Sequence, residues 1–235
     1  MSHFTPPPGY ARIKLVSSFA ELVSTPFADG VNALCWPRDL AGDFAEVVAQ
    51  LGTSEGVNLL DEARLQALDL SAAGRAAVDA LLEDQRLLRA HGLAPVLECI
   101  HAYPRDEEPG LVPVDVYSWH VDSAPVMTDT WLCTYHGACS EGLRNDEARR
   151  RVDVPETRAE LLAEFGGEDD GEFREFLADH CYDLHYAAEP AAHPFPFGLF
   201  NLWRLAVEYP GAPVPPCIHR APVEKAGQPR LLLIS

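Results

Sequence analysis

The stretch LVPVDVYSWHVD, residues 111–122, is rich in valine and aromatic residues and ends in the only His-x-Asp triplet of the chain. Such residues favour strands, and a strand directs residues two apart to the same face of its sheet. His120 and Asp122 are therefore expected to point together from one strand end, where both could ligate one metal ion. Two ligands do not make a metal site, so a third has to come from elsewhere in the chain.

Short apolar segments of similar composition recur in the second half of the chain. They are rich in Val, Leu, Trp, Tyr and Thr, are separated by Pro, Gly and Asp, and lie at 93–104, 128–137, 197–207 and 229–235. Segments of this length, bounded by turn residues, are typical of strands. The second half of the chain is therefore expected to build a β-sheet core.

The first part of the chain has helical periodicity instead. Apolar residues recur at steps of three and four within 42–52 and 61–92, and Gly92 is a suitable residue to end the second of these helices. A short helix and an extended apolar piece, VNALCW at 31–36, come before them. These patterns predict a mainly helical N-terminal segment, residues 1–94, that packs on the core.

An acidic stretch at about 141–185 also has helical spacing and separates the early strands from the late ones. The sequence therefore predicts an α+β chain that forms one compact unit. In this prediction residues 95–235 form the core, and the stretch at about 141–185 is a helical insert within it.

The charge of the chain limits its partners. Acidic residues outnumber basic ones by 36 to 18, which gives a formal net charge of −18. A field of this sign repels nucleic-acid phosphates and anionic membrane surfaces. The basic stretch RNDEARRR, 144–151, alternates with acids and is interpreted as a solvated helix face. We expect neither nucleic acid nor a membrane as a partner.

The N-terminal residues lack the apolar segment of a signal peptide, and no run of 18 apolar residues is present. The six cysteines form no C-x-x-C pair. They are interpreted as mostly buried free thiols in a reducing compartment. A cytoplasmic location is therefore expected.

The end of the chain offers the third metal ligand. His219 lies in the extended segment CIHRAP, 217–222, and Arg230 begins an apolar run eleven residues later. Two histidines and one carboxylate form the facial triad of non-haem Fe(II) oxygenases, which leaves coordination positions open. Burial of an arginine is costly without a partner, and its guanidinium suits a carboxylate. Arg230 is therefore expected to bind a ligand carboxylate.

The order of these residues resembles the Fe(II)/2-oxoglutarate-dependent dioxygenases. The chain has H-x-D on an early strand, a long gap, and then HRAPVEKAGQPRLLLIS at 219–235. The resemblance covers residues 95–235. It implies a double-stranded β-helix, that is, a jelly-roll or cupin-like core, and oxidation of a small-molecule or peptide substrate.

Carried over to this sequence, the resemblance implies that His120, Asp122 and His219 bind Fe(II). It also implies that Arg230 binds the far carboxylate of the co-substrate 2-oxoglutarate. Many members of the family have a hydroxyl residue two positions after this arginine, where this chain has Leu232.

Another residue would therefore have to supply the hydroxyl next to 2-oxoglutarate. Thr134 and Tyr135, on the strand after the H-x-D triplet, are the candidates. Arg204 lies within an apolar strand. If its side chain faces the cavity it could hold a substrate carboxylate, and otherwise it extends to solvent.

Two other functions remain open on the sequence alone. The first is a non-catalytic cupin-like module that binds a metal or another ligand. The second is a structural zinc site, because zinc ligands of the right chemical type are present although their spacing matches no standard finger. These residues are Cys133, His136, Cys139, His180, Cys181, His185 and His193.

Overall fold

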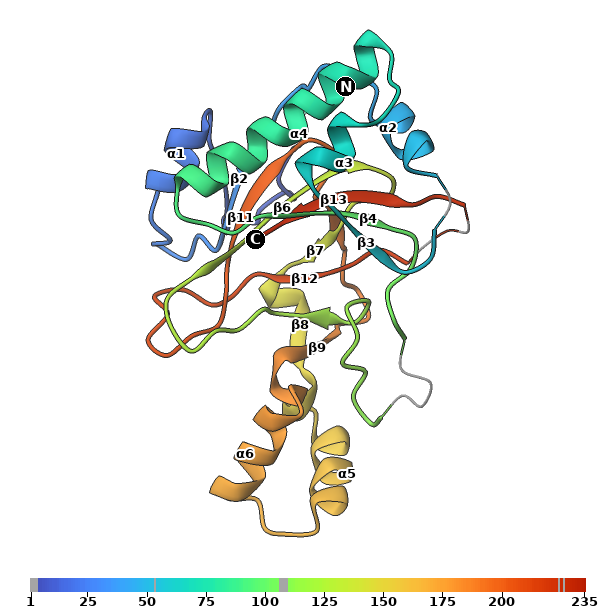
Figure 1. The fold of residues 1–235 in the computed structure, drawn as a ribbon. Coiled ribbons are helices and arrows are strands. Elements are labelled where there is room, and N and C mark those ends of the chain that lie inside the picture. Colours follow the sequence, from blue (N-terminus) through green and yellow to red (C-terminus); the bar gives the residue numbers. More distant parts are fainter. Residues whose placement is uncertain (1–3, 53, 106–109, 224, 226) are drawn as a thin grey trace.

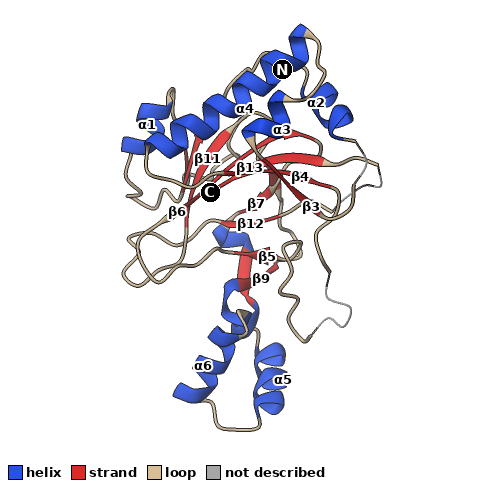
Figure 2. Ribbon diagram, viewed as in Figure 1, coloured by secondary structure: helices blue, strands red, loops and turns tan. Residues whose placement is uncertain are grey.

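The computed structural model describes residues 4–52, 54–105, 110–223, 225 and 227–235. Within these residues the chain is a mixed α+β protein with 13 strands in two sheets. Figure 1 shows a helical layer on one side of the sheets and a helical segment that projects from the other side. Figure 2 shows that most of the strands lie between these two helical parts.

Most of the α-helices are capped by an Asp or Ser side chain that accepts a backbone N–H of the first turn, a role these residues favour. The caps are Ser18, Asp43, Asp61, Ser71 and Asp170. The α-helices are α1 (Phe19–Ser24), α2 (Phe44–Leu51), α3 (Glu62–Gln66), α4 (Ala72–Ala90), α5 (Pro155–Phe165) and α6 (Gly171–Asp179). The 3-10 helices are η1 (Asn145–Glu147), η2 (Arg151–Asp153) and η3 (Tyr182–Leu184).

The first sheet has seven strands in the order β1-β2-β11-β6-β13-β4-β3. They are β1 (Ile13–Leu15), β2 (Ala33–Trp36), β3 (Val57–Leu60), β4 (Val96–Ile100), β6 (Asp129–His136), β11 (Leu202–Ala206) and β13 (Arg230–Ile234). β1 and β2 are parallel, and the other neighbours are antiparallel. β6, from the middle of the chain, and β13, from its end, therefore lie side by side at the centre of this sheet.

The second sheet has six strands in the order β10-β7-β12-β5-β9-β8. They are β5 (Trp119–His120), β7 (Glu141–Leu143), β8 (Ala148–Arg150), β9 (His185–Ala188), β10 (Phe195–Pro196) and β12 (Ile218–Arg220). All of its neighbours are antiparallel. The register places Gly142, His219, His120 and His185 in one row across four strands.

The helices α1 to α4 cover the outer face of the first sheet (Figure 1). Alternate residues of β6, Trp131, Cys133 and Tyr135, pack in one apolar cluster with helix residues such as Leu81 and Leu88. Burial of a large apolar side chain contributes about 1.5–3 kcal/mol. This cluster therefore holds the helical layer on the sheet.

The inner face of the first sheet is turned toward the second sheet. Leu132, Trp203 and Leu232 form a second apolar cluster there with Phe197 and Cys217. The rings of Trp203 and Phe197 stack with centroids 4.4 Å apart, and Trp203 Nε1 donates a hydrogen bond to the Phe197 carbonyl. The space between the sheets is therefore an apolar core.

The helices α5 and α6 form a hairpin that projects away from the sheets (Figure 1). Leu161, Phe173 and Leu177 of this hairpin pack with Val112 and Val152 in a separate apolar cluster. The hairpin therefore has its own small core and is attached at the end of the second sheet.

The predicted division into a helical front and a strand-rich back is correct only in part. VNALCW forms β2, as expected, but β1 and β3 also come from residues 1–94 and pair at the two edges of the first sheet. These edge strands have three and four residues, which is too short to show a strand periodicity. Their pairing with β2 and β4 stabilises them.

The predicted start of the helical insert is wrong. Residues 141–143 form β7 within the second sheet, and the first α-helix of this region begins at Pro155. The stretch 144–151 is not a helix face either, because it forms η1, β8 and the start of η2. Non-local pairing overrides a weak helical pattern here.

Within the described part of the chain, no helix is long and apolar enough to cross a membrane. All six cysteines are free thiols, and Cys35, Cys99, Cys133 and Cys217 are buried. The prediction of mostly buried free thiols is therefore confirmed.

Candidate metal centre

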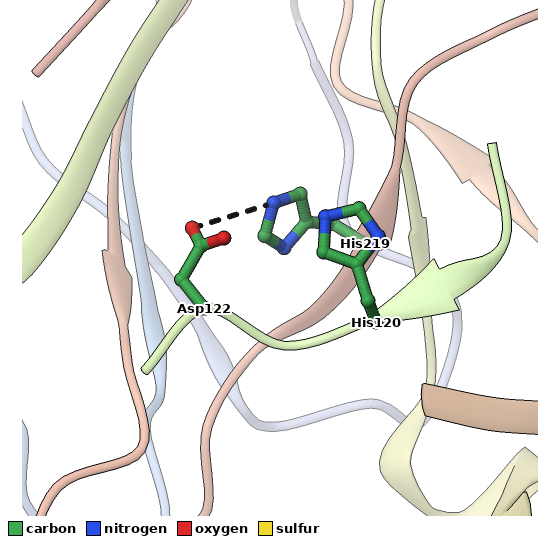
Figure 3. Close-up of side chains that lie close together, drawn as sticks. All are labelled: His120, Asp122 and His219. Atoms are coloured by element: carbon green, nitrogen blue, oxygen red, sulfur yellow. Dashed lines mark ion pairs between the residues drawn. The ribbon is translucent and has the colours of Figure 1, made fainter. Parts of the chain in front are cut away.

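His120, Asp122 and His219 converge at one place on the second sheet (Figure 3). β12 pairs with β5 so that His219 lies directly opposite His120, with ring centroids 4.7 Å apart. Asp122 follows β5, and its Oδ2 lies 3.6 Å from His219 Nε2. One ligand atom from each residue lies within 4.8 Å of the others. The structure thus brings together the three residues predicted as metal ligands.

Both imidazoles are oriented by backbone carbonyl groups. His120 Nδ1 lies 2.8 Å from the Ser118 carbonyl oxygen, and His219 Nδ1 lies 3.2 Å from that of Cys217. A carbonyl oxygen only accepts hydrogen bonds, so Nδ1 carries the proton in each ring and Nε2 keeps its lone pair. Metal-ligating histidines are commonly held in this way. Nε2 is therefore the available ligand atom of both residues.

The Asp122 carboxylate is held from the first sheet. Thr130 Oγ1, on β6, donates a hydrogen bond of 2.5 Å to Asp122 Oδ2. Burial on its own raises the pKa of Asp122, but the charge of His219 and the hydrogen bond from Thr130 outweigh burial, so the pKa lies below its usual value. Asp122 is therefore an ionised candidate ligand at neutral pH.

Burial also sets the protonation of His120. It lowers the pKa of His120 to about 4, and the neighbouring His219 acts in the same direction. The imidazole of His120 is therefore neutral at pH 7, as ligation requires. The Asp122 side chain is 35% exposed and that of His219 only 9%, so the cluster opens to solvent on the side of Asp122. Imidazole and carboxylate donors suit divalent ions such as Fe(II), Co(II) and Zn(II).

Arg230 lies on the inner face of the first sheet and is only 2% exposed. Its Nε donates to the Ala138 carbonyl at 2.7 Å, and its Nη2 donates to Ser140 Oγ at 3.1 Å. The Ser140 carbonyl in turn accepts the N–H of Phe197, and the Phe197 ring lies 6.5 Å from that of His219. A short chain of contacts therefore connects Arg230 to the three-residue cluster.

Two hydroxyl groups lie near Arg230 on this inner face. Ser140, which the sequence analysis did not identify, is its direct partner. Thr134 pairs in register with Leu232, two residues after the arginine. The Thr134 hydroxyl is buried, and it has no hydrogen-bond partner among the described residues. It is therefore a candidate hydrogen-bond partner for a ligand at the inner face of the first sheet.

Tyr135 and Arg204 point to the other face of the first sheet, away from the cluster. Tyr135 donates its hydroxyl to Asp84 of α4. Arg204 pairs with Asp129 at 2.7 Å, and its Nη1 donates to backbone carbonyls at the end of α1, among them that of Thr25. The structure therefore does not bring either residue to the predicted co-substrate or substrate position. On their strands Tyr135 and Arg204 alternate with the residues that face the second sheet, so their side chains point to the opposite face.

The alternative zinc ligands are not brought together. Within the described ranges, the one group of at least three His, Cys, Asp or Glu residues with metal-binding geometry is His120, Asp122 and His219. Cys133 lies under the helical layer beside Arg38, while the His180 ring lies 4.5 Å from that of Phe176 in the projecting hairpin. The structure thus gives no support to a structural zinc site of these residues.

Two residues that position the predicted site residues were not identified from the sequence. Thr130 of β6 donates to Asp122, and Ser140, just before β7, accepts from Arg230. No spacing rule links residue 130 to residue 122, so only the pairing of the sheets brings their side chains together. The parity of β6, with Thr130, Leu132 and Thr134 on one face, is the single sequence signal for Thr130.

Comparisons with family models, with curated proteins and with solved structures find no match for this chain. Its function therefore has to be inferred from the geometry described above. The informative features are three convergent donors with oriented Nε2 atoms, and a buried arginine on the facing sheet.

Proposed function

We propose that this chain is a non-haem oxygenase that depends on Fe(II) and 2-oxoglutarate and oxidises a small or medium-sized substrate. The observation that carries the proposal is the convergence of His120, Asp122 and His219 with both histidines oriented to present Nε2. Two imidazoles and one carboxylate are the donor set of such enzymes, and they leave positions free for a chelating co-substrate.

The buried arginine of the facing sheet supports the choice of co-substrate. Arg230 presents a forked set of donors, which matches a carboxylate, and it is oriented by Ser140. The partnerless hydroxyl of Thr134 lies on the same inner face. Arg230 also acts on the carboxyl of Glu98. Burial raises the pKa of Glu98, and the positive charge of Arg230 partly opposes this rise. A dicarboxylate such as 2-oxoglutarate suits this combination of a cation and a free hydroxyl.

We also propose that the core is a double-stranded β-helix. In chain order the strands β4, β5, β6, β7, β10, β11, β12 and β13 alternate between the sheets, except that β7 and β10 both lie in the second. The resulting orders, β11-β6-β13-β4 and β10-β7-β12-β5, are antiparallel throughout. This order supports a jelly roll, in which a long hairpin is wound into two facing sheets. The remaining strands then extend the sheet edges.

The residues of the chain would have separate roles in this reaction. His120, Asp122 and His219 would hold Fe(II), and the bound ion would supply the redox chemistry with dioxygen. Thr130 keeps Asp122 in position, and the apolar walls at Phe197 exclude bulk water. In this class of reaction one atom of dioxygen enters succinate and the other enters the substrate, while carbon dioxide leaves.

The proposal is tested by anaerobic titration of the metal-free protein with Fe(II) and then with 2-oxoglutarate. We expect the visible charge-transfer band of a chelated Fe(II) complex. His120→Ala should abolish the band, and Arg230→Gln should require at least 10-fold more 2-oxoglutarate to form it. Arg149→Gln is the matched control, because this arginine is exposed and its loss changes the net charge equally. The control should behave as the wild type.

Other outcomes separate the alternatives. Fe(II) binding without a band would refute the oxygenase assignment and favour a cupin-like binding module. Failure to bind any metal would refute both. Circular dichroism of each variant shows whether it is folded, so that a lost band is attributed to the site.

A further inference from the structure

The row of histidines on the second sheet continues beyond the candidate metal centre. His185 of β9 lies opposite His120 in the register, and their ring centroids are 5.7 Å apart. Cross-strand partners share a face of a sheet, so His185 points to the same side as the metal-ligand candidates. His185 Nδ1 lies 2.7 Å from Ser118 Oγ, and its Nε2 makes no hydrogen bond within the described part of the chain.

Arg151 lies next to His185 at the end of this row. β8 pairs with β9 so that Arg150 is opposite Tyr186, and Arg150 Nε donates to the Tyr186 hydroxyl on the other face of the sheet. The next residue, Arg151, therefore comes beside His185. Burial lowers the pKa of His185, and the positive charge of Arg151 lowers it further.

Arg151 has no ion-pair partner within the described ranges. Its Nε is buried without a hydrogen bond, and no ion pair to Arg151 exists among the described residues. Burial lowers the pKa of its guanidinium. By contrast, Arg149 and Arg150 pair with Glu189 and Glu208. A half-buried cation without a counter-ion is destabilising, so an anion that binds to Arg151 would remove this cost.

Asp115 lies near His185, but its carboxylate does not neutralise the charge of Arg151. Asp115 opposes the lowering of the pKa of His185. Its Oδ1 already accepts the backbone N–H groups of Tyr117 and Ser118. The carboxylate of Asp115 is therefore part of the turn before β5, and it forms no ion pair with Arg151.

We propose that Arg151 and His185 form an anion-binding site beside the candidate metal centre, and that this site takes the carboxylate or phosphate group of the substrate to be oxidised. The inference rests on the proposed function and adds a substrate class to it. Arg230 lies on the facing sheet, so the two arginines serve two different anions. The guanidinium fork of Arg151 provides the donors, and the neutral imidazole of His185 lies beside it.

The site is tested by isothermal titration calorimetry of the protein with propionate and, separately, with inorganic phosphate. Both the metal-free protein and the protein loaded with Co(II) are used. We expect Arg151→Gln to weaken the binding of the preferred anion at least 10-fold. Arg149→Gln should change it less than 2-fold. The anion that binds more tightly to the wild type identifies the substrate group as carboxylate or phosphate.

A second measurement connects the site to the metal. In the Fe(II) complex with 2-oxoglutarate, the preferred anion should shift the charge-transfer band of the wild type and of Arg149→Gln. It should not shift the band of Arg151→Gln. Because Arg151 has no ion pair to lose among the described residues and its burial is costly, Arg151→Gln should keep or raise the melting temperature of the wild type. Weaker anion binding by Arg151→Gln would therefore reflect the lost site and not a loss of folding.

Equal anion binding by the wild type and Arg151→Gln would overturn the proposal, as would an equal loss in Arg149→Gln. The absence of binding of both anions to the wild type would overturn it too, whether or not metal binds. Anion binding that depends on Arg151, in a protein that forms no charge-transfer band, would support the anion site and refute the oxygenase function. The two failures are therefore distinguishable.

Discussion

At the scale of single residues, Thr130 connects the two sheets at the candidate metal centre. Its hydroxyl donates to the Asp122 carboxylate at 2.5 Å. Removal of such a hydrogen bond to a ligand typically lowers metal affinity about 10- to 100-fold. We expect this loss for Thr130→Val, which keeps the shape of the side chain, and we expect Thr130→Ser to retain most of the affinity. Competition titration with Co(II) measures it, and equal affinity of Val and Ser variants would contradict the role of the hydroxyl.

Ser140 gives a matching prediction on the side of the co-substrate. Its Oγ accepts a hydrogen bond from Arg230 Nη2 at 3.1 Å, which fixes the rotamer of the arginine. One such hydrogen bond contributes about 0.5–1.5 kcal/mol. Ser140→Ala should therefore weaken 2-oxoglutarate binding about 2- to 13-fold and leave the affinity for Fe(II) unchanged. Titration of the charge-transfer band with 2-oxoglutarate checks this, and a parallel loss of Fe(II) affinity would argue against a specific effect.

The metal-ligand candidates could be predicted from the sequence because their relation is local or ordered along the chain. His120 and Asp122 are two residues apart, and a strand places them on one side. Thr130, Ser140 and Arg151 could not be predicted, because their roles depend on which strands pair and on the parity of each strand. RNDEARRR looked like a solvated face, yet Arg151 within it lies beside His185.

At the scale of elements, strand β6 separates two functions by alternation. Thr130 and Thr134 face the space between the sheets, while Tyr135 donates its hydroxyl to Asp84 of α4 at 2.5 Å. Asp84 also pairs with Arg38, and both side chains are under 10% exposed. Tyr135 is therefore expected to hold α4 on the sheet and not to contact 2-oxoglutarate. Sequence parity alone could not tell which of the two neighbouring hydroxyls lies on the inner face of the first sheet.

Tyr135→Phe should therefore lower stability without a change at the site. Loss of this buried hydrogen bond leaves Asp84 with Arg38 as its remaining partner, and we expect the free energy of unfolding to fall by about 1–2 kcal/mol. Urea denaturation measures this change. The affinity for 2-oxoglutarate should stay within 2-fold of the wild type. A large loss of 2-oxoglutarate affinity in a stably folded Tyr135→Phe would contradict the assignment.

The elements themselves could be predicted where they are long and periodic. The helix predicted within 61–92 is divided into α3 and α4, and the strand within 128–137 corresponds to β6. The short strands β5, β7, β8 and β12 have two or three residues each, and no periodicity is visible at that length. Partner strands define them instead. Gly142 of β7 illustrates this, because a Cβ there would overlap the rings of Phe195 and Phe197.

At the scale of the whole molecule, two buried imidazoles on one sheet affect the pH dependence of stability. Burial lowers the pKa of both His120 and His185 to about 4, whereas the unfolded chain has the ordinary value near 6.5. Between these values the unfolded state binds protons that the native state does not, so stability falls as the pH falls from about 6.5 to about 4. Above about pH 7 this contribution is complete.

The metal-free protein should therefore lose stability between pH 7 and pH 5, even though its large negative net charge becomes smaller over that range. A lowered imidazole pKa corresponds to a slope of at most about 1.4 kcal/mol per pH unit. His185→Gln should reduce the slope of the wild type by about 1 kcal/mol per pH unit. His193→Gln is the control, since the His193 side chain is 85% exposed and its loss should leave the slope unchanged. Urea denaturation at a series of pH values measures the slopes, and equal slopes for the wild type and His185→Gln would show that His185 is not held neutral in the folded protein.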